Sequence, residues 1–316
     1  NSEWTLPSTA SMLTGKYQHN HGFFHPKFNH YLHNNDTLNS IFSKNGFTTF
    51  YIGGGWRNSP PYGHINSIDR ALFKRYMKSD DVINYSIDHL SGLKSNNHFM
   101  QLCFLDVHHL LGVIPEFSSQ INLDIEGHNV TPWYDNENEK KSIFFEKQDY
   151  LIQIYKNQLQ KLDSKLEILY NYLNKNFDND QLIISLISDH GQSYLTSEKI
   201  DLNDTRLKVP WILKYPGSSY KKINELTQNL DLFNTLVHLN NFKSNNTDSI
   251  LPSFLSQKEG RSYTISQSIF PNRTYKFALR FKNNEIYHFE TSKQINNNGF
   301  ICIKEDYKIT VKNKNK

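Results

Sequence analysis

Two places in this chain combine residue types that can do chemistry. Asp189 and His190 directly follow a strongly apolar run, residues 181–187. Such a run is typical of a buried strand, and open α/β sheets bind ligands where their strands end. A carboxylate beside an imidazole makes a good pair of ligands for a divalent cation. The alternative is a strand-end aspartate that caps the next turn, with His190 merely adjacent.

The second place is Thr5, which comes just before a short segment that favours a helix. Pro7 suits a first helical turn, and Gly15 suits a C-terminal stop. A helix N-terminus carries partial positive charge and backbone N–H groups that bind anionic oxygens. A hydroxyl at this position becomes a nucleophile when a metal or a base lowers its pKa. The alternative is that Thr5 only caps the helix.

Alternating helices and strands are expected to position these groups. The apolar periodicity predicts an α/β fold, with helices at 36–46, 80–93, 146–174 and 229–239 and strands at 47–52, 98–105, 181–187 and 209–214. The strand at 181–187 suits the middle of a parallel sheet. From Tyr263 onward the pattern changes to strands at 275–281 and 285–289, which predicts a small antiparallel element. We expect a main domain at 1–245 and a strand-rich subdomain at 246–316 packed on it.

Composition excludes several classes of protein. The 316 residues carry a formal net charge of only +4, and no basic run is long enough to indicate nucleic-acid binding. No stretch is apolar enough to span a bilayer. Two cysteines far apart in sequence cannot form a disulfide scaffold. Residues 110–145 are poorly periodic, and we expect a long loop near the site there.

The order of the motifs resembles the sulfatase and alkaline-phosphatase superfamily, from residue 1 to about residue 240. The motifs are Thr5-x-Pro7-Ser8 with Thr14-Gly15, Asp106-x-His108, Ser188-Asp189-His190-Gly191, Lys199 ahead of Val209-Pro210, and the helix at 229–236. Each is moderately specific, and their order and spacing together are strong. The resemblance implies an alkaline-phosphatase-like α/β/α sandwich with a mostly parallel central sheet.

The resemblance also implies roles for single residues. Thr5 is the expected nucleophile and metal neighbour, and Asp189 and His190 are the expected ligands of a divalent ion (Mn, Zn, Mg or Ca). His108 is expected to contact the ester or its leaving group, and Lys199 to hold the anionic group as charge builds on its oxygens. The alternatives are a strand-end polar residue at 108, with His109 facing the site instead, and a solvated loop lysine at 199.

Three departures from the family pattern bear on the substrate. Thr5 stands where sulfatases carry the Cys or Ser that becomes formylglycine, and Thr9 stands where they carry arginine. Threonine cannot become the aldehyde hydrate, which favours phosphate over sulfate. In addition, Gly53-Gly54-Gly55-Trp56 replaces the Gly-Lys-Trp-His of sulfatases, so that lysine and histidine are missing from the motif.

These observations predict a metal-dependent hydrolase or phosphotransferase that cleaves a phosphoester, on a glycan or a lipid-linked substrate, through a Thr nucleophile. One alternative is a sulfuric ester hydrolase that works without formylglycine. Another is a non-catalytic member that binds an anionic glycan or a scaffold partner. Family members begin with a strand that ends in acidic metal ligands, and we expect this strand to precede residue 1 in the full-length protein. The alternative is that the protein has lost a metal ligand. The sequence assigns no compartment and no oligomeric state.

Overall fold

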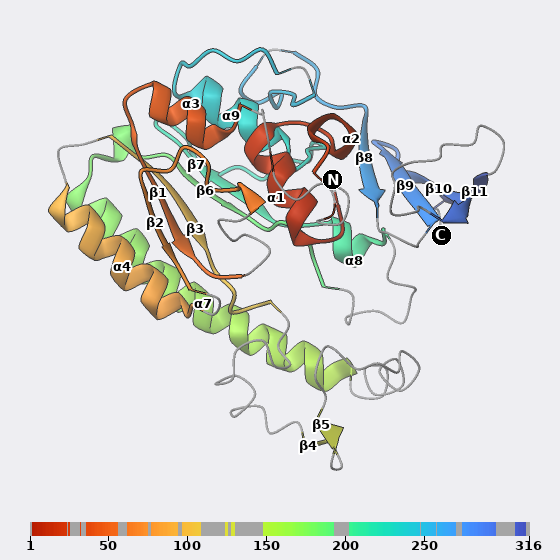
Figure 1. The fold of residues 1–316 in the computed structure, drawn as a ribbon, viewed down its shortest axis with the longest axis horizontal. Coiled ribbons are helices and arrows are strands. Elements are labelled where there is room, and N and C mark those ends of the chain that lie inside the picture. The colour runs from red at the N-terminus through yellow and green to blue at the C-terminus, as the bar shows by residue number, and fades with distance from the viewer. Residues whose placement is uncertain are drawn as a thin grey trace.

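The computed structural model, drawn as a ribbon in Figure 1, combines a parallel sheet flanked by helices with an antiparallel sheet near the C-terminus. It describes residues 2–23, 25, 32, 36–55, 62–74, 77–93, 97–108, 124–125, 128–129, 148–192, 202–246, 248–256, 258–269, 274–294 and 307–313.

Three parallel strands form the first sheet, in the order β2-β1-β3. They are β1 (Thr48–Gly53), β2 (Arg70–Phe73) and β3 (His98–Cys103). The strands β1 and β3 pair from Thr48↔His98 to Gly53↔Cys103. At the end of β1 a Cβ added to Gly53 would lie 2.6 Å from the Cβ of Cys103, so glycine permits this close approach.

Helices cover both faces of this sheet, as Figure 1 shows. On one face lie α4 (Ser79–Gly92) and α7 (Gln148–Asn176), and on the other lie α1 (Thr5–Thr14), α3 (Leu38–Lys44) and α9 (Asp231–Leu239). The side chains of β3 divide accordingly. Met100 and Leu102 pack with Val82 of α4, whereas Phe99 stacks on Phe42 of α3 with 4.2 Å between ring centroids. The expected α/β/α layering is therefore confirmed.

The start of α3 illustrates how the sequence sets these boundaries. Thr37 accepts a hydrogen bond from the backbone N–H of Ser40, and Ser40 accepts one from the N–H of Thr37, which forms a capping box. The remaining short elements are α2 (Gln18–His21), a 3-10 turn η3 (Asn179–Gln181), α8 (Asp204–Leu207) and the antiparallel pair β4 (Asp124–Ile125) and β5 (His128–Asn129).

The strand before Asp189 differs from expectation. The segment forms β6 (Ile184–Ile187), which in the described part of the chain pairs only with β7 (Trp211–Lys214), and it does so antiparallel. Leu186 and Ile212 stand opposite each other and are 40% and 62% exposed. Ile187 and Trp211 instead pack on the core beneath α3 and α9. The prediction of a strand inside a parallel sheet was wrong here, because an apolar run indicates burial and carries no information on strand direction.

The C-terminal region forms the expected antiparallel sheet, in the order β11-β10-β9-β8. Its strands are β8 (Tyr263–Ser268), β9 (Thr274–Phe281), β10 (Glu285–Gln294) and β11 (Tyr307–Asn313). The edge strand β8 meets the start of the chain through a parallel bridge between Ser2 and Gln267. The domain boundary at residues 245 and 246 stays a prediction.

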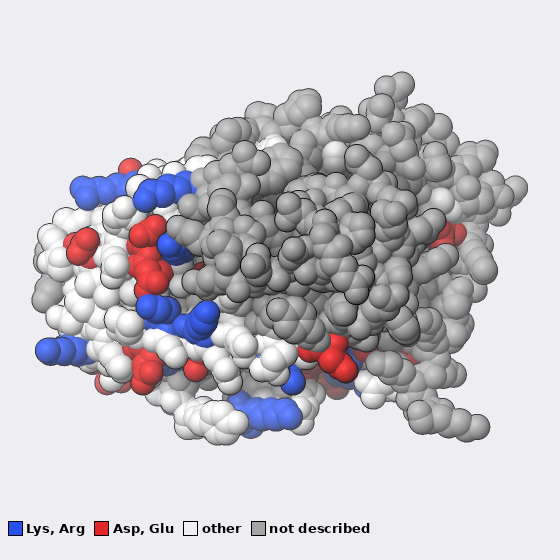
Figure 2. All heavy atoms as spheres, turned by 90° about the horizontal axis from the view of Figure 1, so that it is seen from below, with Lys and Arg blue, Asp and Glu red and all other residues white. Residues whose placement is uncertain are grey.

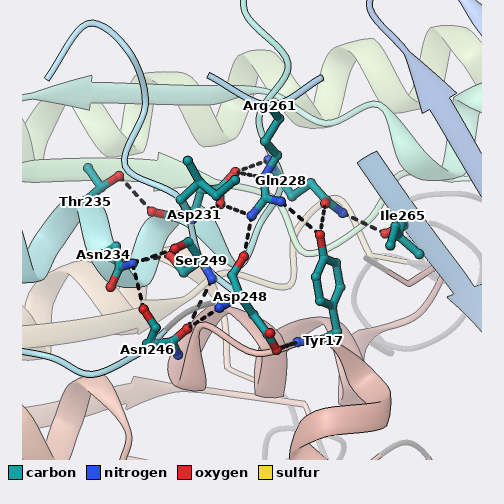
Figure 3. Close-up of polar contacts among 11 residues, drawn as sticks. Tyr17, Gln228, Asp231, Asn234, Thr235, Asn246, Asp248, Ser249, Arg261 and Ile265 are labelled. Atoms are coloured by element: carbon teal, nitrogen blue, oxygen red, sulfur yellow. Dashed lines mark hydrogen bonds and ion pairs between the residues drawn. The ribbon is translucent and has the colours of Figure 1, made fainter. Parts of the chain in front are cut away.

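A buried ion pair, shown in Figure 3, connects the segment just before β8 to the helix layer. Arg261 donates from both Nε and Nη2 to the carboxylate of Asp231, at the start of α9. Its Nη1 donates to the Tyr17 hydroxyl at 2.9 Å, and that hydroxyl donates to Gln228 at 3.0 Å. Gln228 in turn donates to the carbonyl of Ile265 in β8 at 2.7 Å. Every charged group of the pair is thus hydrogen-bonded, as a buried ion pair requires.

The surface carries charges of both signs. Figure 2 shows basic and acidic side chains interspersed over the described part of one face, without a patch of one sign. Lys165 and Asp80, for example, form an ion pair at 2.5 Å between α7 and α4. Of the helices that the structure describes, none combines the length and apolar character needed to cross a membrane.

Candidate active site

The hydroxyl of Thr5 meets the residues that follow β6. Thr5 is the first residue of α1, preceded by Trp4 in an extended conformation, and its side chain is buried. Its Oγ1 lies 3.2 Å from Nε2 of His190, 185 positions further along the chain. The two places singled out in the sequence therefore form one site.

Hydrogen bonds around His190 determine which ring nitrogen faces Thr5. Nδ1 lies 2.7 Å from the carbonyl oxygen of Gly191, an acceptor only, so we assign the ring proton to Nδ1. Nε2 then keeps its lone pair, pointing towards Thr5 and towards Asp189, whose Oδ2 is 3.4 Å away. The other Asp189 oxygen, Oδ1, accepts the backbone N–H of His190 at 2.9 Å.

The polar neighbours of Asp189 favour its ionised form. Burial acts to raise the pKa of the Asp189 carboxyl, but His190, a hydrogen bond from Thr5 and the nearby His108 outweigh it, and the pKa is lowered. Burial lowers the pKa of His108 to about 4, with Asp189 opposing the shift and His190 and Arg206 adding to it. At neutral pH the site therefore presents a carboxylate next to a neutral His108.

Ser8 and Asn229 fasten α1 to the end of β6. The Ser8 hydroxyl donates to the backbone carbonyl of Asp189 at 2.6 Å. The Asn229 amide donates to the same carbonyl at 2.7 Å and lies 3.2 Å from both Ser8 Oγ and the Ser188 carbonyl. This clamp fixes the distance between the Thr5 hydroxyl and the strand end. The sequence analysis missed Asn229, because no local pattern marks a side chain whose partners lie 40 or more positions away.

The structure describes only some of the other predicted residues. His108 follows β3 and lies within electrostatic reach of Asp189 and His190, whereas its expected contact with the ester stays a prediction. Asp106, two residues earlier, accepts the Ser79 hydroxyl at 2.7 Å and so joins the end of β3 to the start of α4. Lys199, His109 and Trp56 lie outside the described residues.

The donors at this site suit a divalent cation. Among the described residues, no three His, Cys, Asp or Glu side chains gather at metal-type spacing, so the set consists of Asp189, His190 and the hydroxyl of Thr5. A carboxylate, a hydroxyl and an imidazole nitrogen are ligands for such ions. The bond from His190 Nδ1 to a backbone carbonyl is the arrangement usual for a metal-binding histidine, since it leaves Nε2 as the donor. These residues therefore fit part of a metal site.

Comparison with known proteins identifies the family of this chain. A family model described as Sulfatase matches residues 2–242. The chain belongs to the sulfatase family. The resemblance to the sulfatase and alkaline-phosphatase superfamily seen in the sequence is thereby confirmed.

One curated relative of this sulfatase-family chain agrees with the family assignment. The extracellular sulfatase SULF-1 homolog of Drosophila melanogaster is 26% identical over 306 residues, covering 79% of this chain. The chain spans only 27% of the length of that relative.

Solved structures extend the likeness to the fold. A 2-O GAG sulfatase superposes with a TM-score of 0.70 at 17% identity, covering 98% of this chain and 75% of the other. The lipoteichoic acid synthase LtaP of Listeria monocytogenes superposes with a TM-score of 0.59 at 12% identity, covering 93% and 73%. The predicted alkaline-phosphatase-like fold is thereby confirmed.

Proposed function

We propose that this sulfatase-family chain carries the site of a metal-dependent hydrolase or phosphotransferase that cleaves an anionic ester, with Thr5 as the nucleophile and a phosphoester as the preferred substrate. The contact between Thr5 Oγ1 and His190 Nε2, at the start of α1 and beside Asp189, carries the proposal.

The residues of the site divide the reaction among them. The Asp189 carboxylate, which is hydrogen-bonded by Thr5, is placed to accept the proton of the Thr5 hydroxyl, whereas His190 Nε2 is kept for the divalent ion. The Thr5 oxygen then forms a bond to phosphorus as the bond to the ester oxygen breaks. His108, neutral at pH 7, donates a hydrogen bond to that leaving oxygen, which takes up a proton from water and departs as the alcohol. Water then hydrolyses the phospho-threonine, or an acceptor alcohol takes the phosphoryl group.

Helix α1 supplies a favourable field for this chemistry. The partial positive charge and the backbone N–H groups of its first turn stabilise negative charge on the non-bridging oxygens. Thr5 is the first residue of the helix, so its oxygen lies at the positive end. A divalent ion held by Thr5, Asp189 and His190 would lower the pKa of the Thr5 hydroxyl. Lys199 is proposed to bind the same anionic group.

Phosphate is favoured over sulfate by the identity of the nucleophile. The family's sulfatases release sulfate from an aldehyde hydrate, which threonine cannot form. Attack by the Thr5 hydroxyl would form an ordinary phosphate ester on the protein, which resembles the covalent intermediate of a phosphatase. The likeness in fold to LtaP is compatible with this choice.

A second candidate is hydrolysis of a sulfated glycan. It is favoured by the names of the relatives, an extracellular sulfatase and a 2-O GAG sulfatase. The site described above provides no sulfate-specific contact that separates the two candidates.

A direct comparison of substrates tests the proposal. The full-length protein is incubated with Mn²⁺ or Zn²⁺ and either an aryl phosphodiester, an aryl sulfate or a 2-O-sulfated glycosaminoglycan, and initial rates are compared. We expect a clearly higher kcat/KM for the phosphodiester. A higher value for either sulfate ester supports the second candidate instead. No turnover of any of the three, together with no metal uptake in calorimetry, favours a non-catalytic member that binds an anionic glycan or a scaffold partner.

A further inference from the structure

The short helix α8 packs directly on the residues that follow Asp189. Gly191 donates its backbone N–H to the carbonyl of Arg206 at 2.8 Å. The Arg206 side chain also contacts this segment, with its Nη1 atom 3.2 Å from the Gly191 carbonyl oxygen and 3.3 Å from His190 Nδ1. A Cβ on residue 191 would lie 1.8 Å from the carbonyl oxygen of Thr205, so the approach requires glycine.

The carbonyl of Gly191 is shared by two donors. His190 Nδ1 lies 2.7 Å from this oxygen, and Arg206 Nη1 donates to it as well. A carbonyl oxygen has two lone pairs and accepts both bonds. The guanidinium therefore holds in place the carbonyl that keeps the His190 proton on Nδ1. This leaves Nε2 directed at Thr5.

Distant parts of the chain hold α8 in turn. Leu202, just before α8, donates its N–H to the buried carboxylate of Glu3 at 3.0 Å, and Glu3 belongs to the segment that leads into α1. Asp204 of α8 forms an ion pair with Arg280 of β9, in the C-terminal sheet. The Arg206 guanidinium is thus supported by both the nucleophile segment and the C-terminal sheet.

We propose that Arg206 is a positioning residue for His190, and that the Asp204–Arg280 pair links this positioning to the C-terminal sheet. The inference rests on the proposed function, because it takes His190 to be a ligand of a divalent ion. Removing a hydrogen-bonding partner outside the ligand set typically costs about 10–100-fold in metal affinity or activity. The C-terminal sheet then supports the site as well as completing the fold.

Calorimetric titration of the full-length protein with Mn²⁺ alone tests the proposal. We expect Arg206→Met to weaken Mn²⁺ binding about 10–100-fold. Arg206→Lys keeps one donor and is expected to fall between Arg206→Met and the native protein. The matched control is Lys208→Met, which removes an ion pair to Asp204 on the same turn, through a side chain 60% exposed. It is expected to change Mn²⁺ affinity by less than about twofold.

Activity at high Mn²⁺ separates positioning from general destabilisation. A positioning role predicts that excess Mn²⁺ restores kcat of Arg206→Met, whereas partial unfolding would lower the active fraction at every Mn²⁺ concentration. Arg280→Met is also expected to weaken Mn²⁺ binding, by a smaller factor than Arg206→Met.

Three results overturn the inference. They are native Mn²⁺ affinity in Arg206→Met, equal losses in Arg206→Met and Lys208→Met, and no uptake of Mn²⁺ by the native full-length protein. If Arg206→Met does not fold, Arg206→Lys decides alone: Mn²⁺ affinity within about twofold of native contradicts the role. Absent Mn²⁺ uptake counts against the proposed function too, whereas failure of the proposed function alone shows as turnover by a Thr5 variant without a hydroxyl while Arg206→Met still weakens Mn²⁺ binding.

Discussion

The hydroxyl oxygen of Thr5 lies 3.2 Å from Nε2 of His190, although 185 positions separate the two residues. The contact forms because α1 begins where β6 ends, and because Ser8 and Asn229 bind the backbone of Asp189 from the helix side. The arrangement places the proposed nucleophile at a helix N-terminus next to the two proposed metal ligands. This contact and its surroundings lead to predictions for individual residues.

Removing the Asn229 amide should loosen the site and the fold together. Asn229→Ala leaves the Asp189 carbonyl with one donor fewer in a buried environment, which costs about 1–3 kcal/mol of unfolding free energy. Urea denaturation measures this loss. Asn20→Ala serves as the control, since its amide bonds Asp248 at the surface and its removal should cost less than about 0.5 kcal/mol. Equal losses in the two variants would contradict the clamp.

The role of His108 is tested by comparing two substitutions. His108→Gln keeps a neutral donor, whereas His108→Phe keeps the ring shape and loses the donor. Because the pKa of His108 lies at about 4, it acts as a neutral donor at pH 7. We expect His108→Phe to lower kcat about 100-fold with an alkyl leaving group, less with an aryl one, and His108→Gln to retain more activity. Equal effects on both leaving groups would exclude contact with the leaving oxygen.

The buried His21 should make the protein sensitive to acid. Phe23 N–H donates to its Nδ1 at 3.0 Å, and Nε2 lies 3.1 Å from Ser11 Oγ, so a neutral ring satisfies both neighbours. Burial lowers the pKa of His21 from 6.5 to about 3, with the nearby His64 adding to the shift. Between these values the unfolded chain binds a proton that the folded chain does not, so stability falls as the pH falls.

For His21 alone the loss amounts to about 3 kcal/mol between pH 7 and pH 4. Denaturant unfolding at several pH values measures the slope. His21→Gln should flatten it, whereas the same change at the exposed His238 should leave it as in the native protein. An unchanged slope in His21→Gln would show that His21 does not contribute.

The Asp231–Arg261 pair should be needed for the attachment of β8. Among the described residues, Arg261→Met leaves the buried Asp231 carboxylate with two backbone donors, from Gln228 and Ile250. Breaking a buried pair in this way costs about 3–5 kcal/mol. The exposed pair Lys44–Asp36 provides the comparison, and Lys44→Met should cost less than about 1 kcal/mol. If the two variants unfold at the same denaturant concentration, Arg261 does not anchor the sheet.

Comparison with the sequence analysis shows which features leave a local trace. The apolar run before Asp189 and the helix start after Thr5 are local patterns, and the order of motifs was enough to predict that the two would meet. The direction of β6 was not predictable, since it depends on pairing with β7, about 25 residues later. Asn229 and Arg206 act through single side chains on distant backbone atoms, and such contacts leave no periodicity. The role of Lys199 stays a prediction.

The most direct test of the account is the turnover of two Thr5 variants in full-length protein. Thr5→Ser keeps a hydroxyl at the start of α1, whereas Thr5→Val keeps the shape of the side chain and removes the hydroxyl. With an aryl phosphodiester and Mn²⁺, Thr5→Val should lose at least about a thousandfold in kcat relative to Thr5→Ser. Equal turnover by the two variants would contradict the central claim that Thr5 is the nucleophile.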